Sequence, residues 1–202
     1  MTNGKESAAP SDMDPKDLPD VPAFQDEFTR SFLTSTEPVR EGYYPFEAKT
    51  GKFTMAFPGD MEVIERSYTN ASARDSEFVD ITHMDNELDL VTNIQLKYYG
   101  FMSSEESIKE GMSKNSNENL DFRPLESQYE GQYIEYADLT EAHRPAFATL
   151  IWNDNKDNIR IFADMSCKKG LSSQRCDEMV KAEKERILKS LKTIKLTETK
   201  EG

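Results

Sequence analysis

The stretch LDLVTNIQLKYYG, residues 88–100, decides the fold class, because it is the longest run in the chain with the composition of a β-strand. It is rich in β-branched and aromatic residues, which fit a pleated, half-buried surface. Shorter strand-like runs lie on both sides of it: residues 53–57, 61–68 and 78–83 before it, and residues 122–129, 132–139, 147–152 and 159–165 after it.

Two segments after the long run have helical periodicity. From Ser103 onward, Ser103 and Glu106 form a capping-box pattern, and Ile108 and Met112 lie one turn apart. We expect a short, mostly exposed helix there, and a longer one over residues 173–191. That longer segment places four residues on one face: Cys176, Val180, Ile187 and Leu191.

The order of elements is strands, helix, strands, helix. Links of hairpin length after Glu118 favour an antiparallel sheet with helices packed on it, so the sequence predicts an α+β fold. We expect a flexible N-terminal tether over residues 1–22, a short helix and linker over 23–41, and one domain over 42–198. In the middle segment, Phe24, Phe28, Phe32 and Leu33 define one face of the short helix.

The amino-acid composition limits which classes of partner the protein can have. The chain has 202 residues, with 38 acidic against 25 basic side chains and a formal net charge of −13. Such a field repels phosphate backbones and anionic lipid surfaces, so nucleic acid and direct membrane adsorption are disfavoured as partners. What remains is an unknown protein or a small ligand.

The first twenty residues are polar, punctuated by proline and almost without hydrophobic side chains. Bacterial lipoproteins carry such a stretch directly after their lipidated cysteine. We therefore expect an extracytoplasmic protein that reaches the membrane only through an N-terminal lipid anchor missing from this chain. The alternative is an ordinary ragged terminus on a cytosolic protein.

The two cysteines of the chain are Cys167, at the end of a strand-like run, and Cys176, at the start of the last helix. A disulfide between them fits an extracytoplasmic location. Two free thiols or a redox pair are the alternatives, while no zinc site is predicted, because the cysteines are not spaced as C-x-x-C.

Two runs resemble PsbP-like domains. The run YYPFEAKTGKFTMAFPGDMEV, residues 43–63, is similar to the opening strands of these domains, and ILKSLKTIKL, residues 187–196, is similar to their closing helix and tail. The resemblance implies an α/β/α sandwich with a central antiparallel sheet and a C-terminal helix packed on it. It also implies a binding role, because photosynthetic members dock on photosystem II and help it retain ions, and a eukaryotic relative binds the GTPase Ran. No functional residue of either carries over.

Four patterns could carry chemistry, and each has a simpler structural explanation. His83 beside Asp85 could form an acid–base pair, but a surface histidine beside one of many carboxylates explains it, and His143 is expected in a turn. Ser166 and Lys169 match S-x-x-K, but at the end of a strand instead of on a helix. The oxygen-rich residues 153–158 lack the glycine and glutamate of a calcium loop and are expected to form a hairpin turn.

The sequence therefore predicts no catalytic residue, no cofactor site and no metal site, and the protein is expected not to be an enzyme. The function expected is a non-enzymatic binding or accessory module tethered at the outer face of a bacterial membrane. One alternative is a hydrolase or transferase whose acid–base site no motif announces. Another is a module that retains divalent cations.

Overall fold

The computed structural model describes residues 9–71, 75–84, 87–140 and 146–197. Eleven strands are present in this part of the chain: β1 (Tyr43–Glu47), β2 (Phe53–Pro58), β3 (Glu62–Val63), β4 (Thr69–Ala71), β5 (Ser76–Thr82), β6 (Leu90–Tyr99), β7 (Arg123–Leu125), β8 (Gln132–Leu139), β9 (Ala146–Asn153), β10 (Asn158–Cys167) and β11 (Lys195–Leu196). The helices are α1 (Pro22–Gln25), α2 (Glu27–Arg30), α3 (Glu105–Ser116) and α4 (Ser173–Leu191), with single 3₁₀ turns at Pro10–Asp12, Pro15–Asp17 and Glu65–Ser67.

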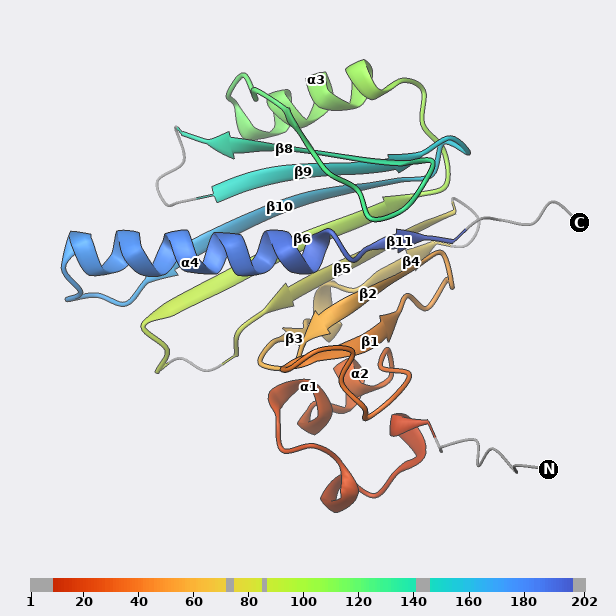
Figure 1. Cartoon of the computed structure of the whole chain (residues 1–202), viewed down its shortest axis with the longest axis vertical. Coiled ribbons are helices and arrows are strands. Elements are labelled where there is room, and N and C mark those ends of the chain that lie inside the picture. Colours follow the sequence, from red (N-terminus) through yellow and green to blue (C-terminus); the bar gives the residue numbers. More distant parts are fainter. Residues whose placement is uncertain (1–8, 72–74, 85–86, 141–145, 198–202) are drawn as a thin grey trace, which may run out of the picture.

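A large antiparallel sheet forms the middle layer, with strand order β3-β5-β6-β10-β9-β8-β7, and β4 pairs with β5 outside this path. A second, three-stranded sheet has the order β1-β2-β11. The long run 88–100 becomes β6, and it is central because its neighbours β5 and β10 pair with it along most of their length. Figure 1 shows these strands running across the molecule, with α4 lying along them.

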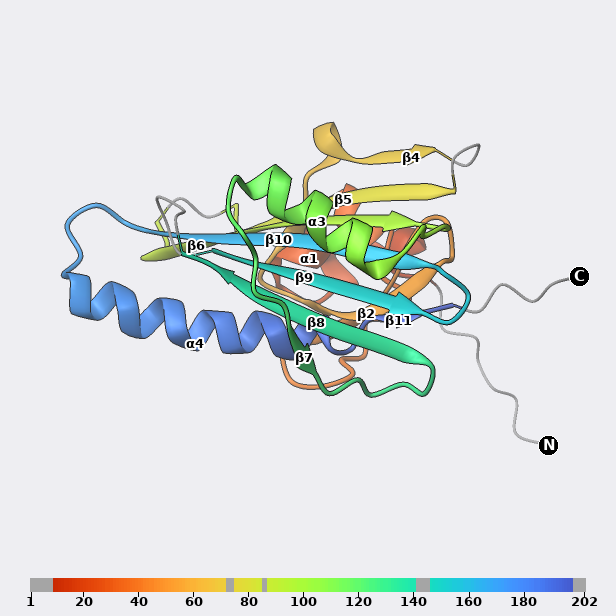
Figure 2. The same ribbon diagram turned by 90° about the horizontal axis from the view of Figure 1, so that it is seen from above.

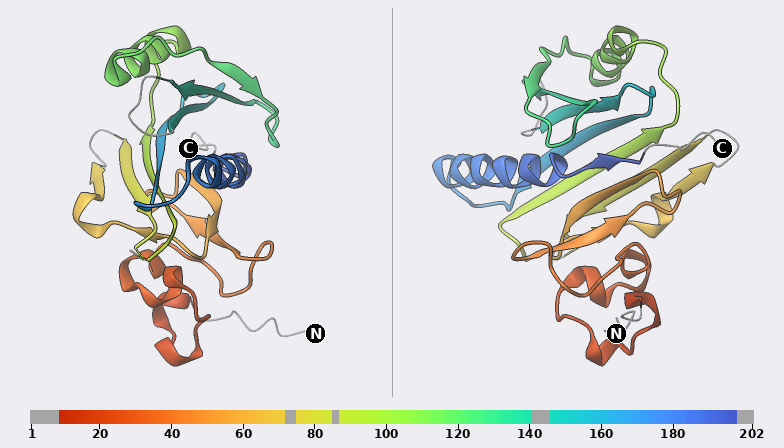
Figure 3. Two further views of the ribbon diagram at one scale, coloured as in Figure 1. Left: turned by 90° about the vertical axis from the view of Figure 1, so that its left-hand side faces the viewer. Right: turned by 45° about the vertical axis from the view of Figure 1, so that its right-hand side comes forward.

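The two faces of the large sheet bury different clusters, because successive side chains of a strand point in opposite directions. On β9, Phe147 and Ile151 enter the main core, while Ala148 and Leu150 enter a smaller cluster with Ile108 of α3. The main core also holds the phenylalanines of β1 and β2 and the inner side of α4. Helices α3 and α4 therefore lie on opposite faces of the sheet, as Figures 2 and 3 show, and the predicted α+β sandwich with a C-terminal helix on the sheet is confirmed.

Buried Glu77 of β5 fastens the small sheet to the large one. Its carboxylate accepts hydrogen bonds from the backbone N–H groups of Lys49 and Thr50 in the β1–β2 turn, both at 2.9 Å. It also accepts from the hydroxyls of Thr50 and Tyr68, the latter at 3.1 Å. A buried carboxylate requires such a set of donors, and three of the four come from the β1–β2 turn of the second sheet.

The N-terminal region differs from the expectation. The helix expected from the spacing of Phe24 and Phe32 is broken into α1 and α2 at Asp26, whose side chain accepts from the N–H of Thr29 at 2.7 Å and so begins a new helix. Within the expected tether, residues 1–8 lie outside the described part. Its later residues include Pro10 and Leu18, which are buried, so this segment contributes to the packing of the domain.

Smaller differences follow from local hydrogen bonding. The strand expected over residues 61–68 is only the two-residue β3, followed by a 3₁₀ turn. The strand expected over residues 122–129 is limited to β7, Arg123–Leu125. Helix α3 is capped by Ser104, which accepts from the N–H of Ser107, so the expected capping box at Ser103 is wrong by one residue.

Candidate functional site

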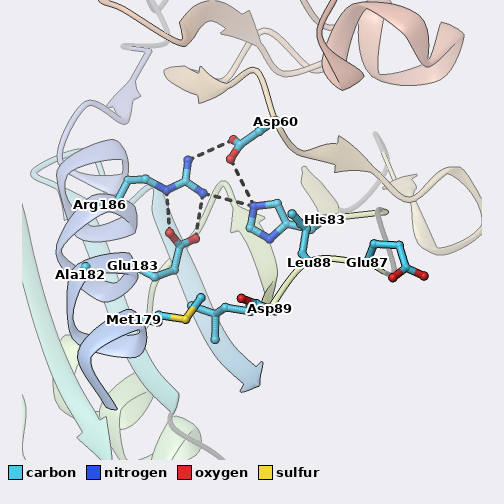
Figure 4. Close-up of a pocket in the computed structure, with 10 residues that line it drawn as sticks. Asp60, His83, Glu87, Leu88, Asp89, Met179, Ala182, Glu183 and Arg186 are labelled. Carbon is cyan, nitrogen blue, oxygen red and sulfur yellow. Dashed lines mark hydrogen bonds and ion pairs between the residues drawn. The ribbon is translucent and has the colours of Figure 1, made fainter. Parts of the chain in front are cut away.

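An open hollow of about 650 Å³ lies between α4 and the β5–β6 hairpin. Figure 4 shows Arg186 and Glu183 of α4 on one side and His83, directly after β5, on the other, with Asp60 of the turn after β2 above them. The hollow thus draws on three segments that are far apart in the sequence. Its position depends on α4 packing over the large sheet.

His83 is the central polar residue of the hollow, and only 6% of its side chain is exposed. The backbone N–H of Thr92 donates a hydrogen bond of 3.1 Å to Nδ1 of the ring. Because Nδ1 is the acceptor, the proton of the neutral ring lies on Nε2, which faces Oδ2 of Asp60 at 3.4 Å. The expected surface position of His83 is therefore wrong. The expected partner, Asp85, lies outside the described residues.

Arg186 is held by two carboxylates. Its Nε and Nη2 donate to the two oxygens of Glu183 at 2.7 and 2.8 Å, a bidentate arrangement, and its Nη1 donates to Asp60 at 3.0 Å. The 3.3 Å approach of Nη2 to Nε2 of His83 joins two donors and is a contact instead of a hydrogen bond. Thr92 completes the network, since its hydroxyl donates to Glu183 at 2.9 Å.

The network changes the acidity of its members. Burial alone raises the pKa of Asp60, but the hydrogen bond from His83 and the charge of Arg186 outweigh it, and the pKa falls to about 2. Burial alone lowers the pKa of Arg186, but the hydrogen bonds and charge of Glu183 outweigh it and raise this pKa. Asp60 and Arg186 are therefore both charged at any physiological pH.

The other half of the hollow is apolar. Leu88 is exposed over 37% of its surface, and Leu90, Met179 and Ala182 lie beside it. Two further carboxylates, of Glu87 and Asp89, lie at the rim on the approach to β6. The hollow therefore presents apolar surface beside a charged wall, which is the usual make-up of a small-ligand site.

The other residues with candidate chemistry are not brought into the hollow. Ser166 lies near the end of β10 and Lys169 in the turn that follows, so the S-x-x-K match has no helix to carry it. Residues 154–157 connect β9 to β10, with Asn153 and Asp157 hydrogen-bonded to each other, so the expected hairpin turn is confirmed. His143 lies outside the described residues. Over the described ranges, no group of three or more potential metal-binding side chains occurs.

Cys167 and Cys176 form a disulfide with their Cα atoms 5.9 Å apart, so the disulfide prediction agrees with the structure. The bond joins the end of β10 to the first turn of α4, one turn before Met179 in the wall of the hollow. It thereby fixes the end of α4 that the hollow depends on.

The sequence could not reveal the hollow, because its residues share no motif. His83 and Asp60 are 23 residues apart, and His83 and Arg186 are 103 apart. The one signal in the sequence is the placement of Glu183 and Arg186 one turn apart in the last helix, and such a pair is also typical of a solvated helix face.

The fold and the hollow define a class: a small antiparallel α+β protein with a surface hollow and a disulfide-tied C-terminal helix. The chain belongs to the family described as "Putative lipoprotein YvcA", whose model matches residues 19–195. In the part of the chain that the structure describes, no helix is long and apolar enough to cross a membrane.

The protein named Putative lipoprotein YvcA from Bacillus subtilis (strain 168) is 33% identical to this chain over 131 residues. The match covers 65% of this chain and 51% of that protein, so this chain spans about half the length of the curated relative. A crystal structure of a protein from Bacteroides thetaiotaomicron VPI-5482 aligns over 80% of this chain and 51% of its own, with 14% identity and a TM-score of 0.39.

Proposed function

We propose that the protein is a non-enzymatic binding module, displayed at the outer face of a bacterial membrane by an N-terminal lipid anchor, with its ligand in the hollow beside α4. The location is supported by the lipoprotein name of the relative and by the polar N-terminal stretch. The disulfide also supports it, since such bonds persist in oxidising compartments.

The observation that carries the binding role is the complete use of both ring nitrogens of His83. A general base needs a free lone pair within reach of its substrate. Here the lone pair of Nδ1 accepts from Thr92, and the proton of Nε2 points at Asp60. The charged groups of this wall are likewise paired with one another, since Arg186 donates to Glu183 and to Asp60. The wall therefore offers shape and charge to a ligand, and its acids and bases are already engaged in hydrogen bonds.

The charge of the hollow favours a cationic ligand. Four of its residues are acidic and one is basic. The donors of Arg186 are spent on Glu183 and Asp60, and Glu87 at the rim pairs with Lys168 at 3.0 Å. The exposed carboxylate of Asp89 is therefore the acid of the rim that we assign to the ligand. Beside the exposed surface of Leu88, this arrangement fits an alkylammonium group, either free or at the end of a protein side chain.

The test is a titration of the isotopically labelled protein with hexylammonium, followed by backbone amide shifts. We expect saturable shifts of residues in α4 and the β5–β6 hairpin, with none for hexanoate or for hexanol. Leu88→Ser and Asp89→Asn should each weaken binding. Asp121→Asn, an exposed acid after α3 and outside the hollow, should leave binding unchanged.

The enzymatic alternative predicts a different result. A hydrolytic activity against ester or phosphoester substrates that His83→Asn abolishes, while the protein stays folded, would contradict the binding role.

Kinship with PsbP-like domains stays a prediction, supported by the order of an opening hairpin, a long strand, a helix, a meander and a closing helix. The cation-retaining role stays a prediction with it.

A further inference from the structure

One part of the large sheet has no helix over it. On the face opposite α4, α3 packs over β8 and β9, as the cluster of Ile108 with Leu150 and Trp152 shows. On this face, opposite α4, the described part of the chain places no α-helix over β5 and β6, as the left view of Figure 3 shows. The strand register decides which side chains this open face displays.

We define the aromatic–cationic face by five residues: Phe78, Lys97, Tyr99, Phe101 and Arg160. Phe78, Lys97 and Arg160 form one cross-strand row over β5, β6 and β10, because Phe78 pairs with Lys97 and Lys97 pairs with Arg160. Tyr99 follows Lys97 on the same side of β6, and Phe101 lies two residues beyond the end of the strand, after Gly100.

The rings of this face form a continuous line. The centroids of Phe78 and Tyr99 lie 5.5 Å apart, and those of Tyr99 and Phe101 lie 6.3 Å apart. Phe101 is exposed over 62% of its surface, the largest exposure among the large hydrophobic residues of the described chain. Its backbone carbonyl is nevertheless fixed by the Asn158 side chain at 2.8 Å, so the ring is held outward on an ordered segment.

The cations of this face are not neutralised. In the described residues, neither Lys97 nor Arg160 forms an ion pair. Lys97 instead lies over the Phe78 ring at 5.7 Å, and Arg160 over the Tyr99 ring at 4.3 Å. Burial lowers the pKa of Arg160, as expected for a half-buried cation without a carboxylate beside it. Asp80 is an acid on the same side of β5, one cross-strand row further along.

This charge pattern is opposite to that of the whole protein, whose formal net charge is −13. Neither cation has an ion-pair partner among the described residues, and both lie beside a line of rings in edge-to-face contact, with interplanar angles of 60° and 76°. This arrangement complements a ligand that offers several small apolar faces and carries scattered negative charges. A nucleic acid has too dense a charge for so acidic a protein. A membrane needs more exposed apolar surface than one strongly exposed ring provides.

We propose that the aromatic–cationic face binds an acidic polysaccharide, one of whose sugar rings stacks on the exposed ring of Phe101 while its anionic groups meet Lys97 and Arg160. The surface is separate from the hollow, since it lies on the opposite side of the large sheet. Variants in one are therefore expected to leave the other unaffected.

The test uses the folded protein and defined probes: an oligogalacturonate for carboxylates, a phosphorylated maltohexaose for phosphates, and maltohexaose as a neutral sugar. Calorimetry and amide shifts should show binding of at least one acidic probe, mapped to β5, β6 and β10, and the arm that binds identifies the anionic group. Phe101→Ala should weaken binding about fivefold, in line with the loss of an exposed ring contact. Lys97→Gln should weaken it about threefold and reduce its sensitivity to salt.

Two matched controls lie outside the face. Val39→Ala removes another exposed apolar side chain, and Lys181→Gln removes an exposed charge on α4; neither should change the affinity. The proposal is overturned if neither acidic probe binds, if maltohexaose binds as tightly, or if the Phe101 and Lys97 variants bind like the controls. It is also overturned if polyglutamate or phosphatidylglycerol vesicles bind more tightly than either acidic sugar, because the face would then recognise a peptide or a membrane.

Discussion

The backbone N–H of Thr92 donates to Nδ1 of His83, and this single hydrogen bond fixes which nitrogen of the ring carries the proton. It joins the end of β5 to the start of β6 beyond the regular pairing of the two strands. Thr92 is fully buried, so its N–H cannot form a replacement hydrogen bond with water if the ring is removed.

His83→Ala should therefore lower the free energy of unfolding by about 1–3 kcal/mol, the cost of a buried donor left without its acceptor. His83→Asn should recover part of this loss, because the amide oxygen of asparagine can occupy the place of Nδ1. Urea denaturation monitored by tryptophan fluorescence measures both. Equal losses in the two variants would show that packing matters here and the hydrogen bond does not.

Asp60 should make the stability depend on pH in the acidic range. Its pKa is lowered from the ordinary 3.8 to about 2 in the folded protein, so the folded state prefers the ionised form. The resulting stabilisation is present above about pH 4 and is lost as the pH falls through about 2. Asp60→Asn should flatten the dependence in this window, as measured by urea midpoints from pH 2 to 5. The effect should be modest, because 56% of the side chain is exposed and solvent screens its partners.

The disulfide should stabilise the docking of α4. Cys176→Ser, or reduction of the wild-type protein, should cost about 2–3 kcal/mol by loop closure. Urea denaturation with and without reductant measures this cost. Alkylation of the denatured protein followed by mass spectrometry provides the check, since two freely alkylated thiols after purification without reductant would disprove the bond. Neither treatment should produce redox activity.

Glu77→Gln should be strongly destabilising, by about 1.5–3 kcal/mol, because the amide replaces a charged acceptor that serves four donors. It should also change the acidity of a neighbour. Burial and the charge of Glu77 raise the pKa of Tyr68 to about 12, and removal of the charge should bring this pKa closer to 10. The pKa of Tyr68 is measured by absorbance titration of the wild-type protein and of Glu77→Gln. Each is compared with the same protein that also carries Tyr68→Phe, so that the difference gives the titration of Tyr68 alone. A Tyr68 pKa unchanged by the substitution would contradict this account.

The sequence revealed elements whose periodicity agrees with their packing. The helix over residues 173–191 and the strand over residues 132–139 have the predicted bounds, because one face of each is buried and the other is solvated. Prediction failed where a single hydrogen bond competes with periodicity. Asp26 begins a new helix inside an expected one, and Ser104 caps α3 in place of its neighbour.

The site was harder to predict than the fold for a physical reason. A hydrogen-bond network depends on which side chains the fold brings together. Here Asp60, in the turn before β3, is the shared partner of His83 and of Arg186 in the last helix. The disulfide could be predicted from the sequence, because the short segment between Cys167 and Cys176 limits the distance between the two cysteines. The unpaired state of Lys97 and Arg160 depends on strand register, which the sequence does not reveal.

The pairing of β11 with β2 has a consequence for synthesis. Lys195 and Leu196 pair with Thr54 and Phe53, so the second sheet consists of a hairpin and a strand that is made much later. About 140 residues must be translated between the two, and contacts of such long range form slowly. Until residue 191 has left the ribosome, the apolar side of β2 has no complete α4 to cover it. The nascent chain is therefore expected to stay an open substrate for chaperones or an export channel until α4 has been made.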